Sequence, residues 1–189
     1  MKFETRAIHI GQLPDPTTGA VIVPVYQTST FHQDGLGVHK GYEYSRTGNP
    51  TRTALEQVVA SLEEGKFGLA YASGVAASAA VLTLFQSGDH IVVGDDLYGG
   101  SYRLFEKVFK KFGLAVSYAD IDDVESFRKA IRPETKLVWV ETPTNPLLKL
   151  IDLKALAKIT KKAGVLLAVD NTFASPYLQK PLLLGADII

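Results

Sequence analysis

Short apolar runs alternate with helical segments along most of this chain, and this alternation is the strongest constraint on its fold. The apolar runs occupy residues 67–73, 90–95, 115–120, 137–142 and 165–171, and helical patterns follow the first four at 75–86, 100–113, 123–131 and 152–164. A short helical stretch at 176–185 and a final apolar run at 186–189 follow the fifth. Continuous Val/Ile/Leu/Ala runs are typical of strands buried on both faces. The sequence therefore predicts an α/β fold with a mostly parallel, doubly wound sheet.

Residues 1–49 have a different character. They are rich in Pro, Gly, Thr and polar residues and contain β-prone pieces such as AVIVPVY, but they show no helical period. We interpret them as an extended arm. An arm that carries apolar residues but is too small to build a core should pack on another subunit. The predicted organisation is an arm at 1–49 that contacts a neighbouring subunit, followed by the first part of a large α/β domain at 50–189.

Two helix starts can be read from capping signals. Asn49 is a favourable N-cap and Pro50 suits the first helical turn, and the apolar residues of 51–64 recur at helical spacing. Further along the chain, Asp122 followed by Glu125 indicates a capping box. We expect helices to begin at both places.

Composition excludes several classes of function. Twenty basic and twenty acidic residues leave no net charge, and no run of Lys/Arg is interleaved with aromatics, so a nucleic-acid partner is disfavoured. The absence of cysteine excludes disulfides and thiolate metal sites, and the four histidines are scattered without metal-ligand spacing. The first residues lack the apolar region of a signal peptide, and no apolar run approaches the ~20 residues that a spanning helix needs. We predict a cytoplasmic protein without a metal or a membrane segment.

Polar residues follow the predicted strands, where ligands collect in doubly wound sheets. Ser73 and Gly74 open a helix after the first strand, and such a turn offers free N–H groups and a positive dipole end to a phosphate. An ordinary helix cap is the commoner explanation of that pair. Nucleotide motifs are missing, since Gly100 stands where a P-loop requires lysine, and neither a serine-hydrolase elbow nor a zinc-protease motif occurs.

Asp170 closes the apolar run VLLAV, where an ionised carboxylate is costly unless a cation or hydrogen-bond donors meet it. A cap or a local Asx-turn would satisfy it, and so would the protonated nitrogen of a pyridine ring. Tyr98 follows a neighbouring predicted strand and is suited to lie against a flat aromatic cofactor, although an ordinary half-buried loop tyrosine is the alternative. These residues leave both possibilities open.

Five longer motifs decide the interpretation when they are taken together and in order. They are YEYSRTGNPTRTALE at 42–56, YASGVAA at 71–77, GDDLYGGSYR at 94–103, ETPTNPLLK at 141–149 and VDNTFASPY at 169–177. The set resembles the family of cystathionine γ-synthase, γ-lyase and β-lyase, which belongs to Cys/Met metabolism, and the resemblance runs from about residue 2 to the last residue. It implies the fold of aspartate aminotransferase (fold type I) and pyridoxal 5'-phosphate (PLP) as cofactor.

The resemblance also implies roles for individual residues. The cofactor-binding residues would be Gly74, Val75, Tyr98, Asn145, Asp170, Thr172, Tyr44 and Arg46. In relatives, the first two bind the phosphate through backbone N–H groups, the tyrosine stacks on the ring, and the aspartate pairs with the ring nitrogen. Asn145 and Thr172 would support the ring, and Tyr98 and Tyr44 would be the catalytic candidates for proton movement.

Tyr44 and Arg46 match family residues that reach the cofactor phosphate of a neighbouring subunit. The resemblance therefore implies at least a homodimer, and family members are commonly homotetramers. The substrate would be a small amino acid.

The reaction that the resemblance implies is γ-elimination from cystathionine or γ-replacement on an activated homoserine. Cystathionine β-lyase and O-acetylhomoserine sulfhydrylase are the alternatives. Gly100 stands where methionine γ-lyases typically carry a cysteine, which disfavours that activity. In the family, the lysine that carries the cofactor follows the position of Ile189, so we expect this chain to be the N-terminal part of an enzyme. A catalytically silent assembly fragment is the non-enzyme alternative.

Overall fold

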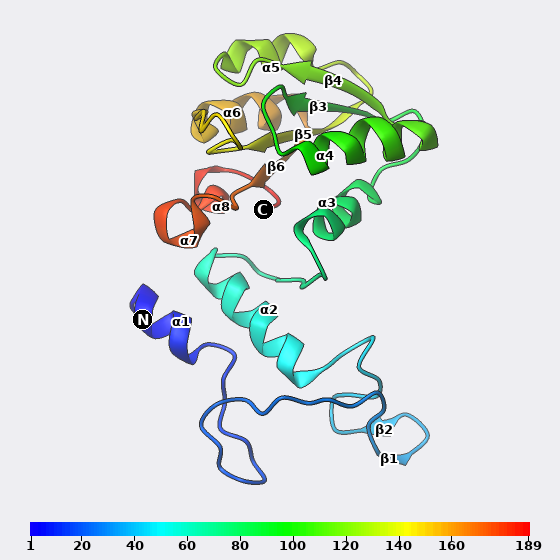
Figure 1. The fold of residues 1–189 in the computed structure, drawn as a ribbon, viewed down its shortest axis with the longest axis vertical. Helices are drawn as coiled ribbons and strands as arrows, with labels where there is room; N and C mark the ends of the chain where they lie inside the picture. The colour runs from blue at the N-terminus through cyan, green and yellow to red at the C-terminus, as the bar shows by residue number, and fades with distance from the viewer. The chain divides into compact units, whose positions relative to one another are not determined.

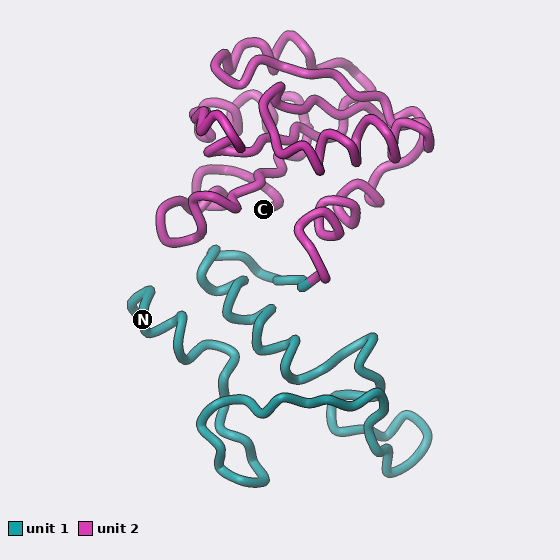
Figure 2. Tube along the Cα trace, in the orientation of Figure 1, with its two compact units in different colours: residues 1–70 teal, residues 71–189 magenta.

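The computed structural model describes residues 1–189, and the chain divides into two compact units, Met1–Ala70 (unit 1) and Tyr71–Ile189 (unit 2) (Figure 2). Unit 1 contains four elements: α1 (Phe3–His9), β1 (Gln33–Gly35), β2 (Val38–His39) and α2 (Pro50–Leu62). The boundary after Ala70 places α2 with the arm, whereas the sequence pattern suggested a division at 49/50. The contact of the arm with a neighbouring subunit stays a prediction.

The start of α2 confirms the expected cap. Asn49 has extended backbone angles, and its side-chain oxygen accepts a hydrogen bond from the Thr51 N–H at 2.9 Å.

The expectation that the arm lacks helix was wrong at α1. That helix is seven residues long and depends on α2, because Arg6 donates to Ser61 Oγ at 3.0 Å and pairs with Glu64 at 2.6 Å. Such tertiary contacts leave no periodic signal in the sequence.

Unit 2 is built on a four-stranded sheet in the order β4-β3-β5-β6, with every neighbouring pair parallel (Figure 1). Its strands are β3 (His90–Gly94), β4 (Ala115–Ala119), β5 (Thr135–Glu141) and β6 (Leu166–Asp170). Its helices are α3 (Gly74–Leu82), α4 (Gly99–Arg103), which continues as π-helix η1 (Leu104–Val108) and 3-10 helix η2 (Phe109–Phe112), α5 (Val124–Ala130), α6 (Leu153–Ala163), α7 (Ser175–Leu178) and α8 (Pro181–Leu184). None of the helices has the length and apolar character needed to cross a bilayer.

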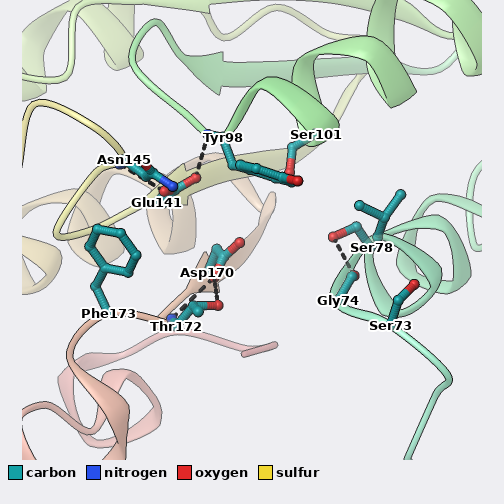
Figure 3. A pocket seen from close by; sticks show the side chains of 11 residues that line it. Ser73, Gly74, Ser78, Tyr98, Ser101, Glu141, Asn145, Asp170, Thr172 and Phe173 are labelled. Atoms are coloured by element: carbon teal, nitrogen blue, oxygen red, sulfur yellow. Dashed lines mark hydrogen bonds between the residues drawn. The ribbon is translucent and has the colours of Figure 1, made fainter.

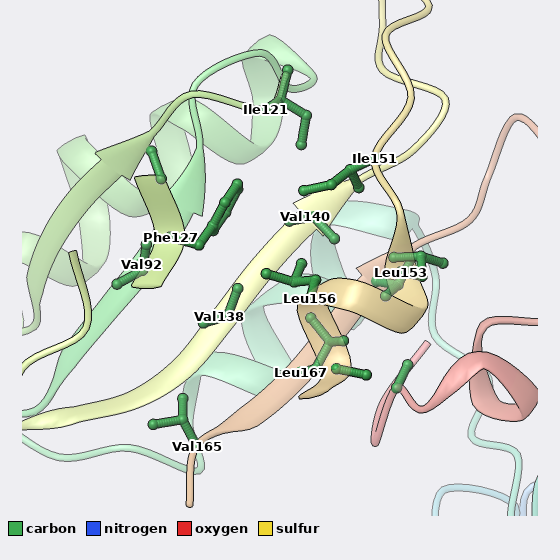
Figure 4. Packing of buried hydrophobic residues seen from close by; sticks show 14 residues of the cluster. Val92, Ile121, Phe127, Val138, Val140, Ile151, Leu153, Leu156, Val165 and Leu167 are labelled. Atoms are coloured by element: carbon green, nitrogen blue, oxygen red, sulfur yellow. The ribbon is translucent and has the colours of Figure 1, made fainter. Parts of the chain in front are cut away.

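Apolar side chains cover both faces of this sheet. On one face, Val92 and Val138 pack with Phe127 of α5 and Leu156 of α6 (Figure 4). On the other face, a second cluster joins the sheet to α3, η1 and η2; its fully buried members include Ile91, Val93, Leu137, Leu82 and Phe105. Successive residues of one strand enter different clusters because side chains alternate across a strand. The prediction of a parallel, doubly wound α/β sheet is confirmed.

Two expected strands are absent or reduced. Residues 67–73 pair with no strand, and Phe67 is 87% exposed, because a strand requires a neighbour that takes up its backbone hydrogen bonds. The final apolar run forms a single parallel bridge between Ile188 and Ala168, in which the Val169 N–H donates to the Ile188 carbonyl at 2.9 Å.

The predicted capping box at Asp122 was wrong by one residue. Asp123 is the N-cap of α5 and accepts from the Glu125 N–H at 2.9 Å, whereas Asp122 pairs with Lys149 at 2.7 Å. Asp122 and Asp123 are adjacent and offer the same capping side chain. Asp122 is engaged by the ion pair with Lys149, and Asp123 caps the helix.

Candidate active site

A pocket of about 320 Å³ lies at the carboxyl ends of the strands in unit 2 (Figure 3). Its walls are formed by Ser73, Gly74, Val75, Ser78, Tyr98, Ser101, Glu141, Asn145, Asp170, Thr172 and Phe173. Six residues that the motifs singled out are therefore neighbours in space, although they span almost a hundred positions of sequence. Parallel strands bring this about because all their carboxyl ends share one edge of the sheet.

One wall of the pocket is the N-terminus of α3. Ser73 caps the helix, since its Oγ accepts from the Ala76 N–H at 3.1 Å. The N–H groups of Gly74 and Val75 have no hydrogen-bond acceptor in the chain, and a side chain added at Gly74 would meet nothing within 4 Å. Ser73 is thus an ordinary cap, while the two following residues leave free donors and open space for an anion.

Two features define the position of Tyr98. Its backbone N–H donates to Glu141 Oε2 at 2.7 Å, which fixes the loop after β3 to the end of β5. Gly100 lies so close to the ring that an added Cβ would stand 2.3 Å from Tyr98 Cε1. The absence of a side chain at Gly100 is therefore what allows the aromatic ring to lie along the start of α4 and line the pocket.

Asp170 divides its two oxygens between its own loop and the pocket. Oδ1 accepts from the Thr172 N–H at 3.1 Å and from the Thr172 hydroxyl at 2.5 Å, which is the local Asx-turn that the sequence allowed. Oδ2 has no hydrogen-bond partner in the chain. The turn accordingly orients the carboxylate and leaves one oxygen available to a ligand.

Glu141 is a second carboxylate at this edge and is register partner of Asp170 on the neighbouring strand. It is only 5% exposed, and burial, with the charge of Asp170 adding to it, raises the pKa of its carboxyl group. The backbone N–H groups of Tyr98 and Asn145 oppose that rise by donating to it. The motifs assigned no role to Glu141, although it ends an apolar strand just as Asp170 does.

Tyr44 and Arg46 lie in unit 1 and are not among the residues that line the pocket. The Arg46 guanidinium stacks over the Tyr44 ring, with its Cζ 4.8 Å from the ring centroid. Arg52 of α2 holds the turn between them by donating to the Ser45 carbonyl at 3.1 Å, and Asn49 Nδ2 donates to Ser45 Oγ at 3.0 Å. The two residues thus form one cationic and aromatic group, and their contact with a phosphate in a neighbouring subunit stays a prediction.

The family described as Cys/Met metabolism PLP-dependent enzyme matches residues 4–189 of the chain. The chain belongs to this family. It is 55% identical to a probable cystathionine γ-synthase of Herpetosiphon aurantiacus, over 99% of this chain and 59% of that protein. It is 57% identical to cystathionine γ-lyase of Bacillus subtilis, over 100% of this chain and 50% of that protein.

Solved structures of this PLP-dependent family share the fold. The crystal structure of metB from Corynebacterium glutamicum matches with a TM-score of 0.96 at 49% identity, covering 98% of this chain and 49% of that one. Cystathionine γ-lyase from Lactobacillus plantarum, complexed with L-serine, matches with a TM-score of 0.95 at 53% identity, covering 99% and 49%. The chain therefore spans about half the length of its relatives, and its fold is that of their PLP enzymes.

The pocket fits the cofactor of the family. PLP carries a phosphate, a flat ring and a basic ring nitrogen, and the pocket offers a complement to each. Free N–H groups of Gly74 and Val75 suit the phosphate, the Tyr98 ring provides an aromatic surface, and the unpaired Asp170 Oδ2 suits a protonated nitrogen.

Proposed function

We propose that the full-length protein with this chain is a PLP-dependent transsulfuration enzyme that acts on cystathionine or an activated homoserine by γ-elimination or γ-replacement. The observation that carries this proposal is the oriented Asp170, whose Oδ2 is unpaired at the edge of a pocket that also holds free phosphate donors. Relatives named cystathionine γ-synthase and γ-lyase, at 55% and 57% identity, support the choice of reaction.

When bound, PLP supplies an electron sink for bonds at the substrate Cα. In this proposal Asp170 keeps a proton on the ring nitrogen, while the hydroxyl and N–H of Thr172 hold the carboxylate in position. Gly74 and Val75 bind the phosphate through backbone N–H groups. Tyr98 and Asn145, which also line the pocket, would hold the ring.

Tyr98 and Tyr44 are the proposed groups for moving protons between substrate carbons. Tyr44 and Arg46 would act in the site of a neighbouring subunit, so the active protein would be a homodimer or a homotetramer. Unit 1 supports this assembly because it buries no apolar side chain of its own. The absence of cysteine is consistent with the proposed cytoplasmic location.

Cystathionine β-lyase is the second candidate, because a relative of that name from Coxiella burnetii is 54% identical over 99% of this chain. The products separate the two reactions. Cleavage of cystathionine at the γ carbon releases cysteine with 2-oxobutanoate and ammonia, whereas cleavage at the β carbon releases homocysteine with pyruvate and ammonia. Synthesis of cystathionine from cysteine and an activated homoserine would identify a γ-synthase, and use of sulfide in place of cysteine would identify a sulfhydrylase.

The test of the proposed mechanism is Asp170→Asn in the full-length protein. Without the carboxylate the pKa of the ring nitrogen falls, and each pKa unit lost lowers the protonated fraction about tenfold. We expect turnover to fall by at least that factor, with a shift in the absorption band of bound PLP. Asp122→Asn is the matched control, because this carboxylate pairs with Lys149 at the surface and does not line the pocket.

Near-normal turnover by Asp170→Asn would reject the assigned role. Wild-type protein that binds no PLP, shows no yellow chromophore that borohydride bleaches, and still forms a defined oligomer would indicate a silent assembly role instead.

A further inference from the structure

We propose that Glu141 is a positioning residue of the PLP pocket: its buried carboxylate fixes the backbones of Tyr98 and Asn145 and so sets two walls of the site relative to Asp170. This inference rests on the proposed function for its ligand. It adds a residue for which the sequence motifs supplied no role, and its geometry stands without the cofactor.

The two hydrogen bonds of Glu141 reach different loops. Oε2 accepts from the Tyr98 N–H at 2.7 Å, in the loop that follows β3, and Oε1 accepts from the Asn145 N–H at 2.8 Å, in the loop that follows β5. Figure 3 shows both bonds meeting at this one side chain on the side of the pocket above Asp170. One carboxylate therefore ties together two segments that are more than forty residues apart.

Only a carboxylate can make this connection without leaving a donor unpaired. Each N–H needs an acceptor, and the two oxygens of Glu141 supply two, whereas an amide side chain would direct its NH₂ group at one of them. No Lys, Arg or His pairs with Glu141, so backbone N–H groups alone offset the cost of its burial. The buried carboxylate of Glu141 accepts only these two hydrogen bonds, both from backbone N–H groups. We therefore assign it the role of positioning the two loops.

The hydrogen bonds of the two neighbouring carboxylates, Glu141 and Asp170, determine which of them keeps a free oxygen. Glu141 and Asp170 are register partners at the ends of β5 and β6, so like charges stand side by side. Thr172 turns one oxygen of Asp170 toward its own loop, while the two N–H groups hold both oxygens of Glu141. As a result, Asp170 alone presents a free carboxylate oxygen at the pocket.

The experiment compares Glu141→Gln with wild type in the full-length protein, first without and then with PLP. Hydrogen exchange resolved by NMR should show at least one of the Tyr98 and Asn145 amides, the one that the NH₂ group of glutamine would face, exchanging about tenfold faster in the variant, as expected when a charge-assisted hydrogen bond is lost. The dissociation constant of PLP should rise by about the same factor. Amides of β3 and β5 should be unaffected, which separates positioning from a general loss of stability.

Asp96→Asn is the matched control because it removes a nearby negative charge and touches neither amide. Asp96 accepts from the Thr144 hydroxyl at 2.5 Å, and the oxygen of asparagine can replace that contact. We expect exchange at Tyr98 and Asn145, and the affinity for PLP, to stay within about twofold of wild type, since an unaltered hydrogen bond keeps its contribution.

If Glu141→Gln does not fold, Glu141→Asp and the wild-type protein supply the answer. In wild type both amides should exchange slowly although they lie in loops, and the shorter side chain should speed both. Unchanged exchange at these amides in a folded variant, or exchange at the rate of an exposed loop in wild type, would overturn the proposal. Loss of PLP binding by wild type itself would instead reject the proposed function, because the measurement without cofactor tests Glu141 alone.

Discussion

Unit 1 and unit 2 of this chain are stabilised in different ways. Unit 2 buries two layers of apolar side chains against a parallel sheet, and its core residues include side chains that are completely inaccessible. Among residues 1–70 the only buried ones are Asp15 and Glu63. The contrast teaches that unit 2 contains a hydrophobic core of its own, whereas unit 1 holds its shape through polar contacts.

The polar contacts of unit 1 form a connected network. Asp15 accepts from the N–H groups of Thr17 and Thr18 and from the Tyr26 hydroxyl at 3.0 Å. The Tyr26 N–H donates to Thr51 Oγ1 at 2.9 Å, and Asn49 Nδ2 donates to the Tyr26 carbonyl at 2.9 Å. The extended segment is thereby attached to the first turn of α2.

Apolar side chains of unit 1 remain exposed as a consequence. Ile8 in α1 and Leu55 and Val59 in α2 are 60%, 52% and 44% exposed. These exposed side chains give the proposed contact with a neighbouring subunit a physical reason, since association would supply the burial that unit 1 lacks.

The largest effect is expected from a matched pair of Leu→Ala substitutions in the two units. Leu156 is fully buried in unit 2, so Leu156→Ala should lower the free energy of unfolding by about 2–5 kcal/mol. Leu55→Ala should change the stability of the isolated subunit by less than about 0.5 kcal/mol, because that side chain is half exposed. Hydrogen exchange measured on peptides of each unit in the full-length protein gives both values.

The same pair of variants can contradict the conclusion that only unit 2 has a hydrophobic core of its own. A loss above about 2 kcal/mol for Leu55→Ala at low protein concentration would show a core that unit 1 holds by itself. A loss that appears only at concentrations where the protein associates would sharpen the comparison, because it would locate the missing burial at a subunit interface.

A smaller effect is expected from the N-caps of α2 and α6. Asn49 caps α2 and also binds Tyr26 and Ser45, whereas Asp152 caps α6 through the Ala155 N–H alone. Asn49→Ala should therefore cost about 2 kcal/mol and Asp152→Ala about 1 kcal/mol. Exchange of amides in α2 and α6 measures the local opening free energies, and equal losses would contradict the idea that unit 1 depends on its polar network.

The comparison between the units also explains which parts of the fold could be predicted from the sequence. The strands β3 to β6 carry their own signal, because strands that are buried on both faces must be continuously apolar. Residues 67–73 carry the same signal but form no strand, since pairing is a property of two segments and not of one. The helix α1 gave no signal because Arg6 binds Ser61 and Glu64, contacts that no local pattern encodes.

The candidate site shows the same limit. The motifs brought Gly74, Tyr98 and Asp170 forward, and the structure lines one pocket with them. The division of the Asp170 oxygens between Thr172 and the pocket depends on side-chain rotation, which the sequence leaves open. Glu141 was missed because its two partners are backbone N–H groups, and backbone donors are the same at every residue except proline.

The smallest expected effect is a difference between the two units in how their stability depends on pH. His90 is fully buried at the start of β3 between Thr135 and Ser117, and burial lowers its pKa from 6.5. Hydrogen bonds from Thr18, the backbone N–H first, lower the pKa of Asp15 from 3.8 in unit 1. In both cases the unfolded chain binds the proton more readily than the folded chain, so each group's stabilising contribution is complete above the ordinary pKa and is lost as the pH falls below it.

Between about pH 6.5 and pH 4, acid should therefore weaken unit 2 through His90 while the Asp15 network of unit 1 stays intact. Over this pH range, hydrogen exchange should become faster at the amides of β3 but not at the Thr18 amide, which donates a hydrogen bond to Asp15. His90→Gln should flatten the profile of unit 2, and the difference between variant and wild type removes the opposite effect of Glu141, whose folded pKa is raised. Equal weakening of both units in wild type would mean that their stabilities are coupled. The difference between apolar burial in unit 2 and polar contacts in unit 1 would then be a difference in packing alone, and the two units would not unfold independently.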